Sequence, residues 1–235
     1  MEKKLFDVEA LRSVLKLTCI LDDLKTRIRS GWLVWRVSSD RLESVYEHCQ
    51  SCLILANALY PLYPDRDKIN LARVNSMLIW HEIGESIIGD VPLVDKKHHE
   101  EKHEQEHEAW KKLLEGLPYE QEVYDLLMEF DDHEEHPEEK TPDAKFAFYI
   151  DKFDAMKTMK RYNDSNCFYD LDWIMEHSAK VDENDDIQEL IKNGAKTPLD
   201  IWFAERYIPF KDDEFFMEAQ RIIREMNTNI APPKL

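Results

Sequence analysis

The sequence predicts an all-α fold, and three observations support this class. The 235 residues are rich in Ala, Leu, Glu, Lys and Met, which are strong helix formers. Glycine is scarce, at 5 residues, while hydrophobic residues make up 43% of the chain, enough for a substantial core. Apolar residues also recur at helical spacing between recognisable start and stop signals. The length fits one large domain with an extension.

The predicted helices at the N-terminal end begin and end at local signals. Residues 7–28 carry apolar side chains along one side of a helix, and a loop then runs to about residue 42. Ser44 opens a second helix, because Glu47 three residues later completes a capping box. This helix continues through an apolar run and stops at Pro61.

A third helix is predicted over residues 67–88. Its segment 74–80 is strongly apolar, so we expect this helix to be buried at the centre of the fold. Gly89 suits the residue that ends a helix in the left-handed conformation, and a loop follows at residues 90–92.

The middle of the chain is much more polar. Residues 97–115 predict a highly charged helix, and Pro118 can open another helix that ends near residue 130. Residues 131–140 are nearly all charged or polar, so we expect a linker there.

The next predicted helix has a clear start, because Thr141 can cap it while Pro142 occupies its first position. Residues 170–226 then predict three or four shorter helices. The expected organisation is a domain, a helical extension packed on that domain and a disordered tail, at residues 1–165, 166–227 and 228–235.

The charge and the cysteines exclude several classes of protein. The net charge of −18 argues against binding of nucleic-acid polymers, which need a basic surface, but allows a small phosphorylated substrate in one locally positive pocket. The 4 cysteines are too few and too scattered for a disulfide framework. No apolar run is long enough to span a bilayer and no signal peptide is recognisable, so a cytoplasmic location is expected without membrane partners.

A candidate site follows the apolar run at the end of the third predicted helix. His81 and Glu82 are expected to be buried, which costs several kcal/mol unless they are paired or bind a metal. His81 and Glu85 would share one helix face, with Glu82 about 100° around the helix. One metal could therefore use His81 and Glu82, while Glu85 orients water or substrate. Alternatively, the helix simply becomes polar as it reaches the surface, and the spacing does not decide between the two.

Two further residues have equally open interpretations. His48 lies in the first turn of its helix, where a lone histidine is more often structural. Asp151 follows a run of apolar residues and needs a partner there. That partner is either a salt bridge to Lys152 or Lys145, or a metal ion.

Four segments together resemble the successive motifs of the HD-domain 5′-deoxynucleotidase family. They are Arg-Ser-Gly-Trp, Glu-Ser-Val-Tyr-Glu-His, His-Glu-Ile-Gly-Glu-Ser-Ile-Ile-Gly-Asp-Val-Pro, and Thr-Pro-Asp-Ala-Lys leading to Ile-Asp-Lys-Phe, at residues 29–32, 43–48, 81–92 and 141–153. The resemblance covers about residues 8–165, with the motifs in order and at plausible spacing.

The resemblance implies an HD-domain helical bundle with one divalent metal. Its H…HD…D ligand pattern maps to His48, His81, Glu82 and Asp151. Members of the family are metal-dependent hydrolases of the 5′-phosphate of deoxynucleoside monophosphates. Mn²⁺, Co²⁺, Mg²⁺ or Fe²⁺ would suit such a mixture of imidazoles and carboxylates. A homodimer is expected from the family as well.

The resemblance also suggests roles for four residues around the metal. Glu85 matches an acid that is implicated in catalysis, and Asp90 matches an aspartate near the substrate, which we count with the catalytic residues. Arg29 would contact the phosphate. Trp32 would lie against the sugar, where a 2′-hydroxyl would clash.

One residue departs from the family pattern. The defining pair of the family is His-Asp, whereas this chain has His81-Glu82. Glutamate keeps the charge and the oxygen donors but adds a methylene group, so metal position and metal preference are expected to shift.

Two other segments match known motifs, HExxH and CxxC, but each also has a purely structural interpretation. The segment from His103 to His107 matches HExxH, the signature of zinc proteases, with both histidines on one helix face. Its flanks are almost wholly charged and no third ligand stands at a familiar spacing, so a solvated helix is favoured, with adventitious metal binding as a possibility. Cys49 and Cys52 form a CxxC inside a helix, which favours core packing.

The aromatic residues of the C-terminal segment are expected to form core or a dimer face rather than a cofactor pocket; they are Trp202, Phe203, Tyr207, Phe210, Phe215 and Phe216.

Three classes of function remain open from the sequence. The first is the deoxynucleotidase. The second is another enzyme on the HD fold, either a nucleoside-triphosphate or small-phosphoester hydrolase, or a di-iron oxygenase that would need extra ligands such as His98 or His99. The third is a catalytically impaired nucleotide-binding or regulatory protein in which Glu82 marks a decayed site.

Overall fold

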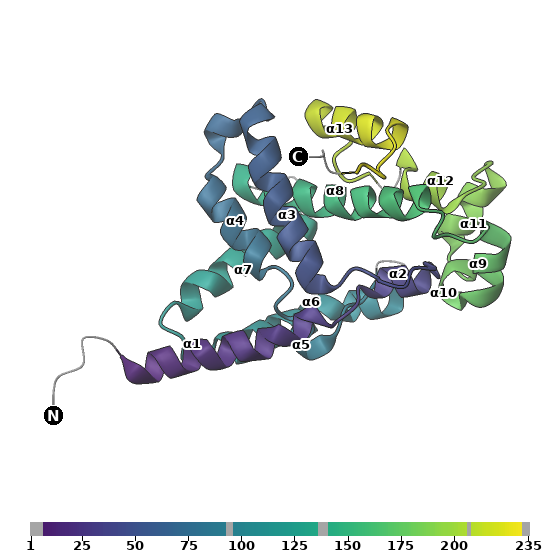
Figure 1. The fold of residues 1–235 in the computed structure, drawn as a ribbon. Coiled ribbons are helices and arrows are strands. Elements are labelled where there is room, and N and C mark those ends of the chain that lie inside the picture. The colour runs from purple at the N-terminus through teal and green to yellow at the C-terminus, as the bar shows by residue number, and fades with distance from the viewer. Residues whose placement is uncertain (1–6, 93–95, 136–140, 206–207, 232–235) are drawn as a thin grey trace.

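The computed structural model describes residues 7–92, 96–135, 141–205 and 208–231, except for the side chains of residues 96–101 and 132–135. The described residues form helices without a β-strand (Figure 1), so the predicted all-α class is confirmed. One isolated antiparallel bridge joins Ile28 to Ser44. No helix in the described part is long and apolar enough to cross a membrane.

Three mutually packed helices form the centre of the fold, namely α3 (Val45–Leu59), α4 (Leu71–Trp80) and α8 (Pro142–Asp164). The capping box of Ser44 and Glu47 is present at the start of α3. Thr141 caps α8, with proline in the first turn, as predicted. Their facing sides bury a continuous apolar cluster, which positions the first turn of α3 against the middle of α8.

The N-terminal region departs from the predicted single helix over residues 7–28. Helix α1 (Val8–Leu21) is followed by a short 3₁₀ helix, η1 (Asp22–Lys25). The backbone of residues 27–29 then pairs with residues 43–45, which draws the chain away from a helical path. The predicted loop after it contains one further helix, α2 (Ser30–Val34).

The third predicted helix is interrupted where the candidate site begins. Two 3₁₀ helices, η2 (Tyr60–Leu62) and η3 (Arg66–Lys68), precede α4. The chain then passes through α4, a turn at residues 81–84 and α5 (Glu85–Ile88). Bonds between residues three apart close the turn, such as that from the Ile83 amide to the Trp80 carbonyl. A Cβ on Gly84 would lie 3.0 Å from the Trp110 ring, so glycine lets helix α6 approach this turn. Gly89 ends α5 with a positive φ of 85°.

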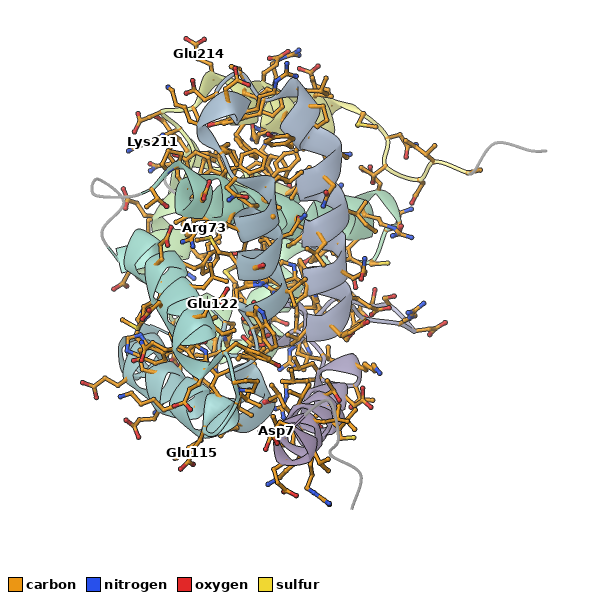
Figure 2. All side chains as sticks on the ribbon, turned by 90° about the vertical axis from the view of Figure 1, so that its left-hand side faces the viewer. Asp7, Arg73, Glu115, Glu122, Lys211 and Glu214 are labelled. Atoms are coloured by element: carbon orange, nitrogen blue, oxygen red, sulfur yellow. The ribbon has the colours of Figure 1, made fainter. Side chains whose placement is uncertain are left out.

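Helices α6 (Lys96–Leu114) and α7 (Glu120–Glu135) pack together and against α1. Helix α7 continues to Glu135, so the first five residues of the predicted linker are helical. A solvated helix was favoured around residues 103–107, but farther along α6 Trp110 and Leu114 are buried in a separate apolar cluster. Glu115 and Glu122, by contrast, point outward (Figure 2).

The C-terminal segment forms five helices within its described residues, where three or four were predicted. They are α9 (Leu171–His177), α10 (Ala179–Asp182), α11 (Asp185–Lys192), α12 (Pro198–Trp202) and α13 (Glu214–Glu225). Helices α12 and α13 contact α8, and α9 to α11 gather at its far end (Figure 1). Of the predicted tail, Thr228 hydrogen-bonds to Asp164, and residues 232–235 lie outside the described part.

Candidate metal centre

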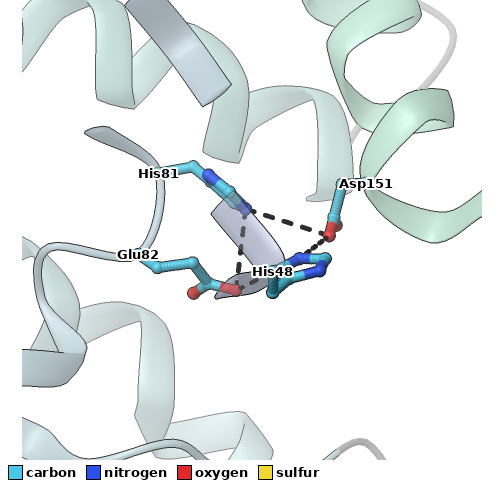
Figure 3. A group of neighbouring side chains, drawn as sticks. All are labelled: His48, His81, Glu82 and Asp151. Carbon is cyan, nitrogen blue, oxygen red and sulfur yellow. Dashed lines mark hydrogen bonds and ion pairs between the residues drawn. The ribbon is translucent and has the colours of Figure 1, made fainter. Parts of the chain in front are cut away.

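Four side chains from three separate segments meet beside the start of α3 (Figure 3). His48 comes from the first turn of α3, His81 and Glu82 from the turn between α4 and α5, and Asp151 from the middle of α8. Each of the four offers one atom within 4.8 Å of the others. The structure therefore brings together the four residues that the sequence named as ligands.

The ligand atoms lie at distances that suit a shared ion. His48 Nε2 is 2.8 Å from Asp151 Oδ1, and His81 Nε2 is 3.9 Å from the same oxygen. Glu82 Oε1 lies 3.6 Å from His81 Nε2 and 4.0 Å from His48 Nε2. Ligands bound to one metal at about 2.1 Å stand roughly 3 to 4 Å apart from one another, so only small shifts are needed.

The proton on His81 can be placed from its hydrogen bond. Its Nδ1 lies 3.0 Å from the Leu78 carbonyl, which can only accept, so Nδ1 carries the hydrogen. The opposite atom, Nε2, is buried without a hydrogen-bond partner and faces Glu82 and Asp151. Burial also lowers the pKa of His81 below its usual value. A neutral ring with an unused lone pair aimed at two carboxylates is the arrangement that a metal ligand requires.

Asp154 fixes the orientation of His48 from the other side of its ring. His48 Nδ1 donates to Asp154 Oδ2 at 3.0 Å, and Asp154 also accepts from Ser51 and Lys157. Burial alone would raise the pKa of Asp154, but these bonds hold it at about 2. A carboxylate behind a ligating histidine is a common support of metal sites. Sequence analysis did not identify Asp154, although an acid three residues after Asp151 on an apolar helix was a usable signal.

Arg29 forms an ion pair with Glu82, the residue at which this chain differs from the family pattern. Its Nη1 lies 3.1 Å from Glu82 Oε1. Burial would raise the pKa of Glu82, but the neighbouring His81 ring and the cations Lys102 and Arg29 hold it well below its usual value, so the carboxylate is ionised. Glu82 Oε1 therefore lies between His81 and His48 on one side and Arg29 on the other.

The position of Asp151 allows both interactions that the sequence left open, a salt bridge to Lys152 and a metal ion. Its Oδ1 faces the histidines, while Oδ2 lies 3.1 Å from Lys152 Nζ. The salt bridge and a metal site are therefore compatible, since they use different oxygens. Two imidazoles and two carboxylates, mostly buried, form a donor set that fits a divalent cation.

The centre opens into a cavity of about 530 Å³, a size typical of small-molecule sites. Arg29, Trp32, Glu85 and Asp90 all line it, as do His81, Glu82 and Asp151. The residues that the sequence proposed for catalysis and substrate binding therefore share one space.

Glu85 and Asp90 are held in different ways. Glu85 is only 1% exposed, and its Oε2 has no hydrogen-bond partner. Burial, with the charges of Glu82 and Asp90, raises its pKa well above the usual value. The Asp90 carboxylate accepts from the Ser30 amide, which ties the loop after α5 to the start of α2. The prediction that Glu85 shares a continuous helix face with His81 was wrong, because the helix is broken between them.

Aromatic residues from distant segments form another wall of the cavity. Trp32 is buried, donates to Glu43 and stacks on Trp202 with ring centroids 5.4 Å apart. Phe203, Phe210 and Phe216 belong to the core as expected, and Trp202 and Phe215 pack against it, while Trp202 also lines the cavity. Tyr207 lies outside the described residues.

Helix α6 supplies cavity residues that sequence analysis missed. Lys102 and Glu106 line the cavity, and Lys102 Nζ lies 3.3 Å from Glu106 and 3.9 Å from Glu85. No local signal marked them, because their neighbours in sequence are equally charged. His98 and His99, considered for an oxygenase, have side chains outside the described part. Cys52 is buried in the core cluster, as predicted for the CxxC segment.

Comparisons with known proteins point to one family. A model of the HD domain family matches residues 21–191. The chain is 29% identical to the human 5′-deoxynucleotidase HDDC2 over 161 residues, covering 68% of this chain and 72% of the relative. It is 30% identical to the Xenopus laevis 5′-deoxynucleotidase HDDC2 over 155 residues, covering 65% and 71%.

A crystal structure of a Pyrococcus horikoshii protein has a similar fold. It superposes with a TM-score of 0.59 at 21% identity, over 89% of this chain and 98% of that one. Together with the family match over most of the chain, this fold and the His-Glu…Asp centre support one conclusion: the chain belongs to the HD domain family.

Proposed function

We propose that this chain is a metal-dependent phosphohydrolase that releases phosphate from 5′-deoxynucleoside monophosphates. One observation carries the proposal: the four candidate ligands converge in a cavity that Arg29 also lines. The family match and the relatives named 5′-deoxynucleotidases support the choice of reaction and substrate.

His48, His81, Glu82 and Asp151 would hold the metal. When bound, a divalent ion supplies a Lewis acid and lowers the pKa of a coordinated water. Mn²⁺, Co²⁺, Mg²⁺ and Fe²⁺ are the candidates, because the donor set mixes imidazole nitrogen with carboxylate oxygen.

Arg29 and Glu85 would act on the phosphate and on the proton of the attacking water. Arg29 is close enough to Glu82 to place its guanidinium beside the metal, where it offsets charge that develops on the phosphoryl group. Glu85 faces the same cavity with an unpartnered oxygen, so it can accept a proton from the nucleophile. Asp90 holds the start of α2, and with it Arg29, in position.

Trp32 supports the preference for a deoxyribose. Its ring is fixed by the bond to Glu43 and by contacts with Tyr162 and Trp202, so it forms a rigid part of the cavity wall. Because a closely packed ring yields little, a 2′-hydroxyl group directed at it would have to displace Trp32.

A phosphate-release screen tests this function. Deoxy- and ribonucleoside mono- and triphosphates are each incubated with Mg²⁺, Mn²⁺, Co²⁺ and Fe²⁺, and we expect turnover of deoxynucleoside monophosphates. Preferential turnover of triphosphates would replace the proposal with a triphosphate hydrolase. Nucleotide binding without turnover in any metal would point to a regulatory protein, and two irons per chain after anaerobic purification to an oxygenase.

Substitutions in the centre provide the second arm of the test. His48→Ala and Asp151→Ala are expected to lose metal content and at least 1,000-fold in kcat/KM, roughly 4 kcal/mol. His177→Ala is the matched control, because His177 is exposed and contacts its own helix through the Trp173 carbonyl and the Trp173 ring. Full activity of either centre variant would overturn the proposed site.

A further inference from the structure

In the folded chain, a residue of the neighbouring helix α7 lies against both histidines of the HExxH segment in α6. Asp131 of α7, only 4% exposed, lies against both histidines. Its Oδ1 is 2.7 Å from His103 Nδ1, and its Oδ2 is 2.7 Å from His107 Nε2. A buried carboxylate held between two imidazoles from the neighbouring helix is not the solvated face that the charged sequence predicts.

Glu106 adds a second oxygen to this group. His103, Glu106 and Asp131 each offer an atom within 4.8 Å of the others. Glu106 lies on the same helix between the two histidines and is only 6% exposed. We call these residues the α6–α7 cluster: His103, Glu106, His107 and Asp131.

The cluster resembles the HD centre in how its side chains pair. In the HD centre, His48 Nε2 lies 2.8 Å from Asp151, much as each histidine of the cluster lies 2.7 Å from Asp131. In both places imidazole nitrogens and carboxylate oxygens converge from separate elements onto a buried aspartate, although His103 and His107 are only half-buried. This is the donor chemistry that zinc and similar ions take.

The local charge also favours a cation. Glu106, Glu82 and Glu85 each offer an oxygen within 4.8 Å of the others, and Asp131 stands beside Glu106. Lys102 is shared between Glu106 and Glu85. A bound dication would offset the mutual repulsion of these carboxylates.

We propose that the α6–α7 cluster is a second metal site, which takes Zn²⁺, with His103, Glu106 and Asp131 as ligands and His107, beside the other oxygen of Asp131, as the fourth donor. Two imidazoles with carboxylate oxygens form a common zinc donor set. The ion would pin α6 to α7 and thereby hold the cavity wall that carries Lys102 and Glu106.

The site is structural rather than proteolytic. In a zinc protease the general base is the glutamate directly after the first histidine. Here that residue, Glu104, is exposed, whereas the buried Glu106 stands one position before the second histidine. The match to HExxH therefore reflects ligand spacing on one helix face and not a peptidase mechanism.

The test measures metal binding, so it stands apart from the proposed hydrolase activity. The full-length chain carrying His48→Ala and Asp151→Asn removes the HD centre. After chelator treatment it is titrated with Zn²⁺ by calorimetry, and with Co²⁺ while the visible spectrum is recorded. We expect one tightly bound Zn²⁺ and an intense Co²⁺ absorption typical of low coordination number.

Adding His107→Gln or Asp131→Asn to that variant should weaken Zn²⁺ binding at least 100-fold and abolish the Co²⁺ absorption. Adding His177→Gln, an exposed histidine, should change neither. Zn²⁺ should also raise the melting temperature of the HD-centre variant, but not after His107→Gln, which reports on the site even where the apo form is less stable. Absence of tight Zn²⁺ binding in the HD-centre variant, or binding that survives both cluster substitutions, would overturn the proposal.

Discussion

At the residue scale, Glu82 sets the geometry of the metal centre. One of its oxygens stands between His81 Nε2 at 3.6 Å and Arg29 Nη1 at 3.1 Å. In the proposed function the residue thus has two tasks, because it would offer a ligand oxygen and it also pairs with Arg29. A carboxylate that is shorter by one methylene reaches less far toward Arg29.

Substitutions at Glu82 should separate these two tasks. Glu82→Gln removes the charge, so we expect weaker metal binding and a loss of about 100-fold in kcat/KM, roughly 2.7 kcal/mol. Glu82→Asp keeps the charge and restores the residue usual in the family, so it should retain more activity but prefer a different metal. The measurement is kcat/KM against Mn²⁺, Co²⁺ and Mg²⁺ concentration. Equal losses for both variants would show that the carboxylate charge at this position is not what matters.

The residues of this centre differ in how far they could be predicted from the sequence. His48, His81, Glu82 and Asp151 were accessible because ordered motifs marked them. Asp154, which lies 106 positions from His48, was not, because no local pattern indicates which helix a buried acid will face. Asp131 was missed for the same reason, since its histidine partners are on another helix.

At the element scale, the helix starts were predicted well and the break in the third helix was not. Capping residues such as Ser44 and Thr141 act within a few positions, so the sequence alone reveals them. The turn at residues 81–84 depends on the approach of Trp110 to Gly84 from α6, which is a tertiary contact. Apolar residues continue at helical spacing as far as Ile83, so the local sequence does not indicate that the helix breaks after residue 80.

Helix α12 contributes to the site although it lies beyond the stretch that the family model matches. Trp202 stacks on Trp32 at an interplanar angle of 17° and lines the cavity. Trp202→Ala should therefore raise KM for deoxynucleoside monophosphates by about tenfold, since stacking and apolar contact contribute roughly 1 kcal/mol or more. The value of kcat should change little, because the metal ligands are on other elements.

Steady-state kinetics with several deoxynucleotides check this expectation, and Trp202→Phe serves as the conservative control. An unchanged KM in Trp202→Ala would place the substrate away from α12.

The segment after α13 is held to α8 by Asp164, which makes stability depend on pH. Asp164 accepts from Lys160 and from the amide and hydroxyl of Thr228. Burial would raise its pKa, but these bonds lower it from 3.8 to about 2. Because the folded pKa is depressed, this contribution is present above about pH 4 and is lost as pH falls toward 2.

Asp164→Asn should thus lower the free energy of unfolding by about 1–2 kcal/mol at pH 7. The difference from the wild type should shrink toward pH 2, where wild-type Asp164 is itself becoming protonated. Chemical denaturation at a series of pH values measures it. A difference that is constant with pH would mean that the ionised carboxylate does not contribute.

At the scale of the whole molecule, the metal centre joins parts of the chain that are far apart in sequence. His48, the turn after α4 and the middle of α8 each supply candidate ligands, so one bound ion would connect the three central helices. Without the ion, Glu82 and Asp151 place ionised carboxylates close together in a buried space. Metal binding should therefore stabilise the entire fold rather than one loop.

The melting temperature should rise when Mn²⁺ is added to the chelator-treated protein. A ligand that binds only the folded state contributes about 2.7 kcal/mol at 100 times its Kd, which for a chain of this size is roughly 5–10 °C. The α6–α7 cluster is excluded as a confounder by repeating the scan with His107→Gln, which removes one of its donors. Asp151→Asn should lose the shift, whereas Asp125→Asn, an exposed aspartate on α7, should keep it. A shift that persists in Asp151→Asn would mean that the ion stabilises the protein from somewhere other than the HD centre.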